Sequence, residues 1–219
     1  MFILVTSLYA KRRLNHMADE NIMHSPEVLI DNGSSKFWVI QNYTPDIYDY
    51  LKDLPLEFEP AIMIMGRQCN QRRDIGFFSD ESVGYKYSGQ VMKSQPLAAA
   101  PILEKLLPML NASLSTSFNG ILVNKYSNGE KYLSAHSDDE RGLDKNGRNM
   151  VVGLAYGPGI RTFRIRDKQT KEIVLDYQHN PGTLIVMEGS FQKDFTHEIP
   201  IQKKVKGERI SITFRHHTE

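Results

Sequence analysis

Cysteine is nearly absent from this sequence of 219 residues, which contains only Cys69. A single cysteine cannot form an internal disulfide, which predicts a reducing location, in the nucleus or the cytoplasm. Long apolar runs are also missing, since none approaches the roughly 18 residues that a membrane-spanning helix needs. The short apolar stretch Phe2–Val5 precedes the basic stretch Lys11–Arg13, which reverses the order typical of a signal peptide. We therefore expect an intracellular protein with no membrane partner.

An excess of charge of either sign is missing too. The chain carries 27 Lys and Arg against 26 Asp and Glu, which gives a formal net charge of +1. No overall electrostatic field therefore attracts the protein to nucleic acid or to a membrane surface. A polyanionic partner would have to bind a local basic patch.

No internal repeat and no low-complexity linker divides the chain, and its length fits a single domain. The start of the chain shows no clear periodicity, so we expect a mobile extension over residues 1–35. The folded domain is then expected over residues 36–219, with its helices in residues 36–117 and its core strands in residues 118–219.

Two helices and two short strands are predicted between residues 36 and 117. Apolar residues recur at helical spacing between Pro96 and Leu110. Thr44 as an N-cap and Pro45 in the first turn predict a shorter helix that ends at Lys52. The remaining predictions for this part are strands at residues 61–65 and 85–87, and a turn or loop at residues 67–74.

Short strands separated by turn sequences dominate the second half of the chain. Gly157-Pro158-Gly159 and Asn180-Pro181-Gly182 are strong turn signals. Many short strands at about ten-residue spacing favour a sandwich or a barrel over alternating strands and helices. We therefore predict an α+β fold in which N-terminal helices pack on a jelly roll, or double-stranded β-helix. The expected strands are residues 121–126, 150–156, 162–166, 173–177, 183–187 and 209–215.

The sequence His136-Ser137-Asp138 brings two metal-ligating side chains together. Alternate side chains of an extended segment share a face, so His136 and Asp138 can point at one ion. Two histidines and a carboxylate are the ligands of non-haem iron enzymes that activate oxygen, and His197 is the candidate for the second histidine. The alternatives are two surface polar residues paired by chance, or a cupin-like metal protein that uses no organic co-substrate. The other histidines are expected to be solvated: His16, His24, His179, His216 and His217.

The predicted strand Arg209–Arg215 has one apolar face and one polar face with an arginine at each end. Arginines turned into a barrel would suit a small dicarboxylate, because guanidinium donors can engage both oxygens of a carboxylate. The two Cα atoms lie about 20 Å apart along an extended strand, so both side chains would have to reach inward. The alternative is a half-exposed strand with two solvated arginines.

Four groups of residues, taken in order, resemble the AlkB family of Fe(II)/2-oxoglutarate-dependent nucleic-acid dioxygenases. They are Asn124-x-Tyr126, His136-x-Asp138, His197 and Arg209-x5-Arg215. The resemblance runs from about Phe37 to the end and is closest to the branch that repairs duplex DNA. It implies a catalytic centre in which His136, Asp138 and His197 hold Fe(II), with 2-oxoglutarate and O2 as co-substrates. The residues that it implies for the 2-oxoglutarate pocket are Asn124, Tyr126, Arg209, Thr213 and Arg215, with Arg209 on the distal carboxylate and Arg215 near the carboxylate bound at iron.

The activity of that family gives the expected function. It is the oxidative removal of N-methyl groups from 1-methyladenine and 3-methylcytosine in DNA, which reverses alkylation damage directly. We expect a monomer whose partner is DNA, or else RNA, with methylated bases. The same chemistry on RNA or on a protein side chain is one alternative, and a catalytically silent relative that only binds nucleic acid is another.

A base inside a duplex must be flipped out before an enzyme can act on it. By the resemblance, Tyr85, Tyr87 and Ser88 belong to a substrate-recognition lid, in which Tyr87 stacks on the base and the other two make polar contacts. Met65 is the expected apolar wedge, and Asp139 contacts the substrate, orients the metal ligands or faces solvent. Ordinary strand positions are the alternative for both tyrosines and for Met65. The basic residues expected to contact phosphates are Arg72, Arg73, Arg164, Arg166, Lys168, Lys203, Lys204 and Lys206.

Overall fold

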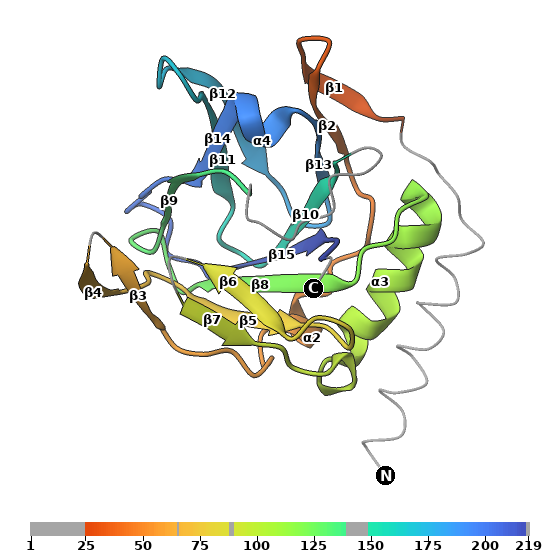
Figure 1. Ribbon diagram of the computed structural model, residues 1–219, viewed down its shortest axis with the longest axis vertical. Helices are drawn as coiled ribbons and strands as arrows, with labels where there is room; N and C mark the ends of the chain where they lie inside the picture. Colours follow the sequence, from red (N-terminus) through yellow and green to blue (C-terminus); the bar gives the residue numbers. More distant parts are fainter. Residues whose placement is uncertain (1–24, 65, 88–89, 139–148, 218–219) are drawn as a thin grey trace.

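The structure is a computed structural model that describes residues 25–64, 66–87, 90–138 and 149–217 (Figure 1). Over these residues strands dominate, and all strand pairs in the two main sheets are antiparallel. The larger sheet has seven strands in the order β1 (Glu27–Asp31), β2 (Ser35–Ile40), β13 (Leu184–Gly189), β10 (Val151–Tyr156), β15 (Arg209–Arg215), β8 (Gly120–Tyr126) and β5 (Asp74–Phe78).

A second sheet of four strands packs on one face of the large sheet. Side chains of both sheets form one buried cluster, in which Ile185 and Met187 of the large sheet join Phe163 and Ile165 of the small one. Apolar burial stabilises such a contact by about 25 cal/mol per Å² of buried area. The strand order of the small sheet is β12 (Ile173–His179), β11 (Arg161–Asp167), β14 (Phe195–Ile199) and β9 (Leu133–His136), and α4 (Phe191–Asp194) connects β13 to β14.

The other face of the large sheet is covered by α3 (Pro101–Leu114), which follows the 3-10 turn η1 (Leu97–Ala99) (Figure 1). Pro101 occupies the first turn of α3, where its missing N–H costs no hydrogen bond. The helix predicted from Pro96 to Leu110 therefore begins later, at Pro101, and it extends further, to Leu114. None of the helices in the described ranges is long and apolar enough to span a membrane.

β15 lies in the middle of the large sheet and presents a different chemistry to each side. Ile210, Ile212 and Phe214 are fully buried in the cluster that includes the leucines of α3. Successive side chains of a strand point to opposite faces. The polar residues of β15 therefore face the small sheet, and the space between the two sheets becomes a polar pocket at this point.

The first part of the chain contains mostly strands, which corrects the expectation of helices over residues 36–117. α2 (Tyr48–Leu51) is a single turn, and Thr44, predicted as its N-cap, is buried and bonded to the Tyr156 hydroxyl instead. A strand over residues 67–70 also replaces the first part of the turn or loop predicted at residues 67–74, which lies outside strands only at residues 71–73. All four of its side chains are exposed, so no apolar pattern marks it in the sequence. The two-stranded sheets of this part are β3 (Ala61–Ile64) with β4 (Arg67–Asn70), and β6 (Gly84–Tyr87) with β7 (Gln90–Lys93).

The N-terminal boundary also differs from the one expected at residue 35. β1 pairs with β2, so the large sheet already begins at Glu27. β1 is an edge strand with exposed or half-buried side chains, and it therefore lacks an apolar alternation. The rest of the expected extension, residues 1–24, lies outside the described residues. The architecture is a mostly-β antiparallel fold with few helices, consistent with a jelly roll.

Candidate metal centre and adjoining pocket

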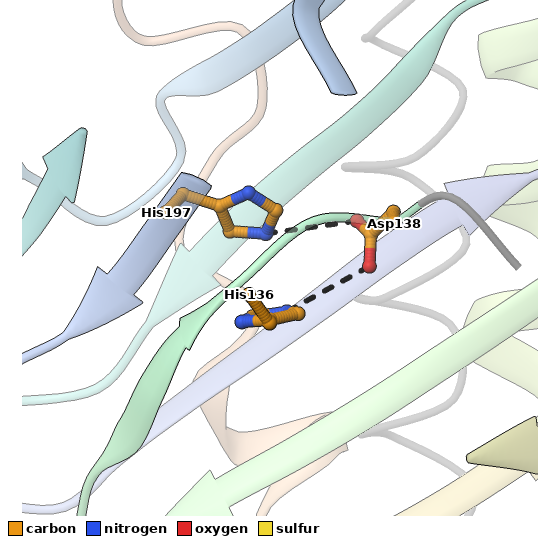
Figure 2. Close-up of side chains that lie close together, drawn as sticks. All are labelled: His136, Asp138 and His197. Carbon is orange, nitrogen blue, oxygen red and sulfur yellow. Dashed lines mark ion pairs between the residues drawn. The ribbon is translucent and has the colours of Figure 1, made fainter. Parts of the chain in front are cut away.

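Two neighbouring strands of the small sheet bring the three predicted metal ligands together. β9 ends at His136, and His197 lies directly opposite it in β14, a strand that the sequence analysis did not predict. Asp138 follows two residues after His136. Figure 2 shows the three side chains turned toward one another, and one ligand atom from each lies within 4.8 Å of the others.

Hydrogen bonds and ring packing orient the two imidazoles. His136 Nδ1 lies 3.0 Å from the Ser134 carbonyl oxygen, so Nδ1 donates there and Nε2 keeps its lone pair. His136 Nε2 is 3.7 Å from Asp138 Oδ1, and His197 Nε2 is 3.6 Å from Asp138 Oδ2 (Figure 2). Phe163 stacks on the His197 ring at a centroid distance of 5.2 Å. The ligand atoms of all three residues therefore converge on one point.

Burial and local charge keep these donors in the protonation state that a metal requires. Burial alone would raise the pKa of Asp138, but the guanidinium of Arg215, 3.1 Å away, holds it at about 2. Burial lowers the pKa of His136, and burial together with His136 lowers the pKa of His197 to about 3. At neutral pH one carboxylate and two neutral imidazoles face a common centre, which fits a divalent cation.

The segment that carries Asp138 is fixed by side chains that no sequence pattern identified. The Asp138 backbone N–H donates to Gln192 Oε1 at 2.8 Å, and Ser137 Oγ donates to the Phe195 carbonyl at 2.9 Å. Gln192 comes from α4 and Phe195 from β14. Both bonds attach the end of β9 to the elements beside His197. They therefore fix the position of Asp138 relative to His197.

A pocket opens from the metal centre between the two sheets. Arg209, 3 % exposed, lies in it with its guanidinium carbon 5.5 Å from the centre of the Tyr126 ring. Over the described part of the chain, its Nε and Nη1 atoms have no hydrogen-bond partner and no carboxylate pairs with it. A buried guanidinium without an anion is costly, so these donors fit a carboxylate ligand. All eight residues predicted for metal and 2-oxoglutarate line this pocket: Asn124, Tyr126, His136, Asp138, His197, Arg209, Thr213 and Arg215.

Arg73 also lines the pocket, although it was predicted for contacts with phosphate. It is buried, and its Nε donates to Asn124 Oδ1 at 2.7 Å. That bond fixes the Asn124 amide with its NH2 group left as a donor. The pocket wall thus contains a third buried arginine, besides Arg209 and Arg215, close to the predicted co-substrate residues.

The sequence over residues 44–215 matches the family described as the 2OG-Fe(II) oxygenase superfamily. The chain belongs to this superfamily. The match spans most of the chain and contains the whole metal centre and the pocket. Fe(II) and 2-oxoglutarate are the cofactors that the family and the triad of His136, Asp138 and His197 imply for this oxygenase.

Relatives of this oxygenase include AlkB homologues. It is 26% identical over 163 residues to "DNA oxidative demethylase ALKBH2" of Bos taurus, covering 70% of this chain and 56% of that protein. The protein of the same name from Arabidopsis thaliana is 29% identical over 205 residues, with 80% and 64% covered. "Alpha-ketoglutarate-dependent dioxygenase alkB homolog 3" of Homo sapiens is 32% identical over 139 residues, with 60% and 47% covered. The chain thus spans between 47% and 64% of the length of these relatives.

Solved structures share the fold of this oxygenase at low sequence identity. The structure of OsALKBH1 superimposes with a TM-score of 0.54 at 15% identity, covering 82% of this chain and 97% of that one. A 2OG-Fe(II) oxygenase family oxidoreductase from Burkholderia pseudomallei gives a TM-score of 0.51 at 14% identity, with 79% and 78% covered. These similarities establish a common fold.

One of the predicted base-recognition residues lies at the pocket of the oxygenase. Tyr85 is buried, lines the pocket, and has the Arg215 guanidinium carbon 5.2 Å from its ring centre. His217, expected to be solvated, packs edge-on against the rings of Tyr85 and Phe77. For Tyr87 the structure describes the backbone, as part of β6. Three of the predicted residues lie outside the described residues: Met65, Ser88 and Asp139.

The basic strand face predicted on β11 is largely neutralised by acidic neighbours. Arg164 makes two hydrogen bonds to the Asp176 carboxylate, and Arg166 donates to Glu198 at 2.9 Å. Surface arginines paired in this way attract phosphate weakly. The lysines of the 203–206 segment and Arg72 are exposed, as expected for side chains that contact a polyanion.

Proposed function

We propose that this oxygenase removes N-methyl groups oxidatively from 1-methyladenine and 3-methylcytosine in DNA, and so reverses alkylation damage directly. The observation that carries the proposal is that the metal triad, the buried Arg209 and Tyr85 line one pocket. Such a pocket can bring a metal, a dicarboxylate and a planar base within reach of one another. Two of the relatives are named DNA oxidative demethylases, which favours the same substrate class here.

The residues of the pocket have distinct roles in this proposal. His136, Asp138 and His197 would hold Fe(II), which with 2-oxoglutarate and O2 supplies the oxidation of a C–H bond. Arg215, next to Asp138, would keep that carboxylate ionised and would lie near the 2-oxoglutarate carboxylate at the metal. Once a methyl group on nitrogen carries a hydroxyl, it leaves as formaldehyde and restores the base. The residues proposed for the rest of the co-substrate are Asn124, Tyr126, Arg209 and Thr213.

The base-recognition elements and the domain limits belong to the same proposal. The hairpins β3–β4 and β6–β7 would form the lid over the base, since Tyr85 of β6 already reaches the pocket. The oxygenase domain would comprise residues 36–219 together with β1, preceded by an extension. The protein would act as a monomer in the nucleus or the cytoplasm. The residues proposed to contact the base are Met65, Tyr85, Tyr87, Ser88 and Asp139, the last of which directly follows the metal ligand Asp138.

A demethylation assay tests the proposal. Purified protein with Fe(II), 2-oxoglutarate and ascorbate is given a DNA oligonucleotide that carries one 1-methyladenine, and mass spectrometry follows the loss of the methyl group. Parallel reactions contain the same lesion in duplex DNA and in RNA, and a methylated peptide. His136→Ala, which removes one metal ligand, is the matched control.

We expect the wild type to lose the methyl group from DNA, to release formaldehyde and to form succinate, and His136→Ala to do none of these. Succinate formation with demethylation of RNA or peptide alone would keep the oxygenase and reject DNA as its substrate. Tight binding of oligonucleotide without succinate, in iron-loaded protein, would identify a silent nucleic-acid-binding relative.

A further inference from the structure

His179 is the last residue of β12 and lies deep between the two sheets. It is 2 % exposed and lines the same pocket as the metal triad and Arg209. Its ring has the aromatic rings of Phe163 and Tyr177 as neighbours, with centroids 6.3 and 6.4 Å away. The sequence placed this histidine beside a Pro-Gly turn and predicted it to be solvated. Its burial in the pocket wall instead suggests that His179 contributes to the pocket.

The hydrogen bonds of His179 define which ring nitrogen carries the proton. Nε2 lies 2.9 Å from the Thr183 carbonyl oxygen, which can only accept, so Nε2 is the donor. Nδ1 of the neutral ring is therefore an acceptor, and it lies 3.3 Å from Nη2 of Arg209, which can only donate. Burial, and after it the charge of Arg209, lower the pKa of His179 to about 3, so the ring stays neutral at physiological pH.

Arg209 has donors left over after this contact. Burial lowers its pKa to about 10, so the guanidinium is still a cation at neutral pH. One nitrogen faces His179, and the guanidinium carbon lies over the Tyr126 ring, 5.5 Å from its centre. Nε and Nη1 have no partner over the described part of the chain. His179 thus engages the guanidinium without neutralising it, whereas a carboxylate in its place would compete with an incoming anion.

We propose that His179 is a positioning residue of the 2-oxoglutarate pocket, which accepts a hydrogen bond from Arg209 and thereby aims the remaining guanidinium donors at the distal carboxylate. The inference rests on the proposed role of Arg209. Without this bond, the long arginine side chain keeps its cation–π contact with Tyr126 but loses the contact that fixes rotation of the guanidinium group. Ordering such a side chain has an entropic cost. The binding of the co-substrate would then have to offset that cost, which lowers its affinity.

Two amide substitutions separate the two hydrogen bonds of His179. His179→Asn places an oxygen near the position of Nδ1 and can still accept from Arg209. His179→Gln places its amide near the position of Nε2, so it can donate to Thr183 but leaves Arg209 without its acceptor. Calorimetric titration of the full-length protein loaded with Mn(II), which does not turn over, measures the affinities for 2-oxoglutarate and for pyruvate, which lacks the distal carboxylate. Arg209→Lys is titrated in parallel.

We expect His179→Gln to weaken 2-oxoglutarate binding about tenfold, as the loss of a hydrogen bond to a charged group does. His179→Asn should bind within about threefold of wild type, because the acceptor remains. The affinities for pyruvate and for Mn(II) should be the same in the wild type and in the two His179 variants. A role confined to packing predicts the opposite pattern, in which both variants lower the melting temperature and change 2-oxoglutarate and pyruvate binding alike.

The arginine variant separates two kinds of failure. If Arg209→Lys weakens 2-oxoglutarate and His179→Gln does not, the inference about His179 is wrong and the co-substrate assignment stands. If Arg209→Lys binds 2-oxoglutarate as the wild type does, the proposed role of Arg209 is wrong and His179 loses its role with it. Should His179→Gln fail to fold, His179→Leu, which also lacks an acceptor, is expected to show the same selective loss of 2-oxoglutarate binding.

Discussion

Gln192 supports the metal centre through a backbone group, at a distance from the ligand atoms themselves. Its Oε1 accepts from the Asp138 N–H at 2.8 Å, and its amide nitrogen lies 3.5 Å from the sulfur of Met187. Removing Gln192 leaves the three ligands in place but frees the backbone that aims the carboxylate. Residues of this kind affect metal affinity because they fix ligand direction.

We predict that Gln192→Ala weakens Fe(II) or Mn(II) binding about tenfold, at the lower end of the effect usual for such supporting residues. Metal affinity is measured by calorimetry under anaerobic conditions. Gln178→Ala is the matched control, since Gln178 is exposed on the edge strand β12 and donates a hydrogen bond to Thr162 of the neighbouring β11. Equal metal affinity of Gln192→Ala and Gln178→Ala would show that the Asp138 segment holds its geometry without Gln192.

At this scale the sequence predicts ligands better than it predicts the residues that support them. His136, Asp138, His197 and Arg209 are recognisable because their residue types and spacing already express a metal and carboxylate chemistry. Gln192, His179 and Arg73 act through partners that are distant in the chain and meet them only when the sheets pack. No pattern in a single sequence marks such contacts.

The two faces of β15 have different roles: one packs in the apolar core, and the other lines the pocket proposed for the co-substrate. Ile212 is fully buried toward α3, whereas its neighbour Thr213 is half-buried and lines the pocket. We predict that Ile212→Ala lowers the free energy of unfolding by about 2–4 kcal/mol, as large-to-small core substitutions do, with little change in 2-oxoglutarate affinity. Thr213→Val should lower the 2-oxoglutarate affinity, with little change in the free energy of unfolding. Urea unfolding and calorimetry on both variants check this, and a loss of stability in both would contradict the division of the strand.

Strands with a buried apolar pattern are the ones that the sequence predicts most readily, although β12, whose side chains are mostly exposed, is also predicted within two residues. β8, β10, β13 and β15 start or end within two residues of the expected positions, because their side chains are buried or alternate strictly. β4 is wholly exposed, so its backbone pairing with β3 leaves no trace in the sequence. Buried and half-buried side chains do alternate along β14, with His197 on the buried face. A histidine, however, is not expected at a core position, so the sequence does not predict this strand.

For the whole molecule, the number and spacing of strands predict a jelly roll, while the order of strands does not follow from the sequence. β2 pairs with β13, and β5 pairs with β8, over long separations in the chain. Those pairings place α3 on one side of the large sheet and the small sheet on the other (Figure 1). Besides the metal ligands, the packed layers bury His179 and partly bury His217, which makes stability depend on pH.

We predict that the metal-free protein becomes less stable as pH falls below about 6.5, the usual pKa of histidine. Burial lowers the pKa of His179 to about 3 and that of His217 to about 4. In the unfolded chain both rings take up protons near pH 6.5, while the folded protein does not. The unfolded state therefore binds more protons, and the stability present above pH 6.5 is lost progressively down to about pH 3. His179 alone contributes a slope of about 1.4 kcal/mol per pH unit within that window.

Urea unfolding at pH 6.0, 5.5 and 5.0, about half-unit steps within the window set by these histidines, and at pH 7.5, above that window, measures that slope. His179→Asn cannot take up the proton in either state, so its slope should be smaller than that of wild type by about 1.4 kcal/mol per pH unit. At pH 7.5, where the histidines are neutral in both states, this difference between the slopes should vanish. Parallel slopes over the whole range would mean that His179 titrates in the folded protein much as it does in the unfolded chain, which its burial beside Arg209 does not allow.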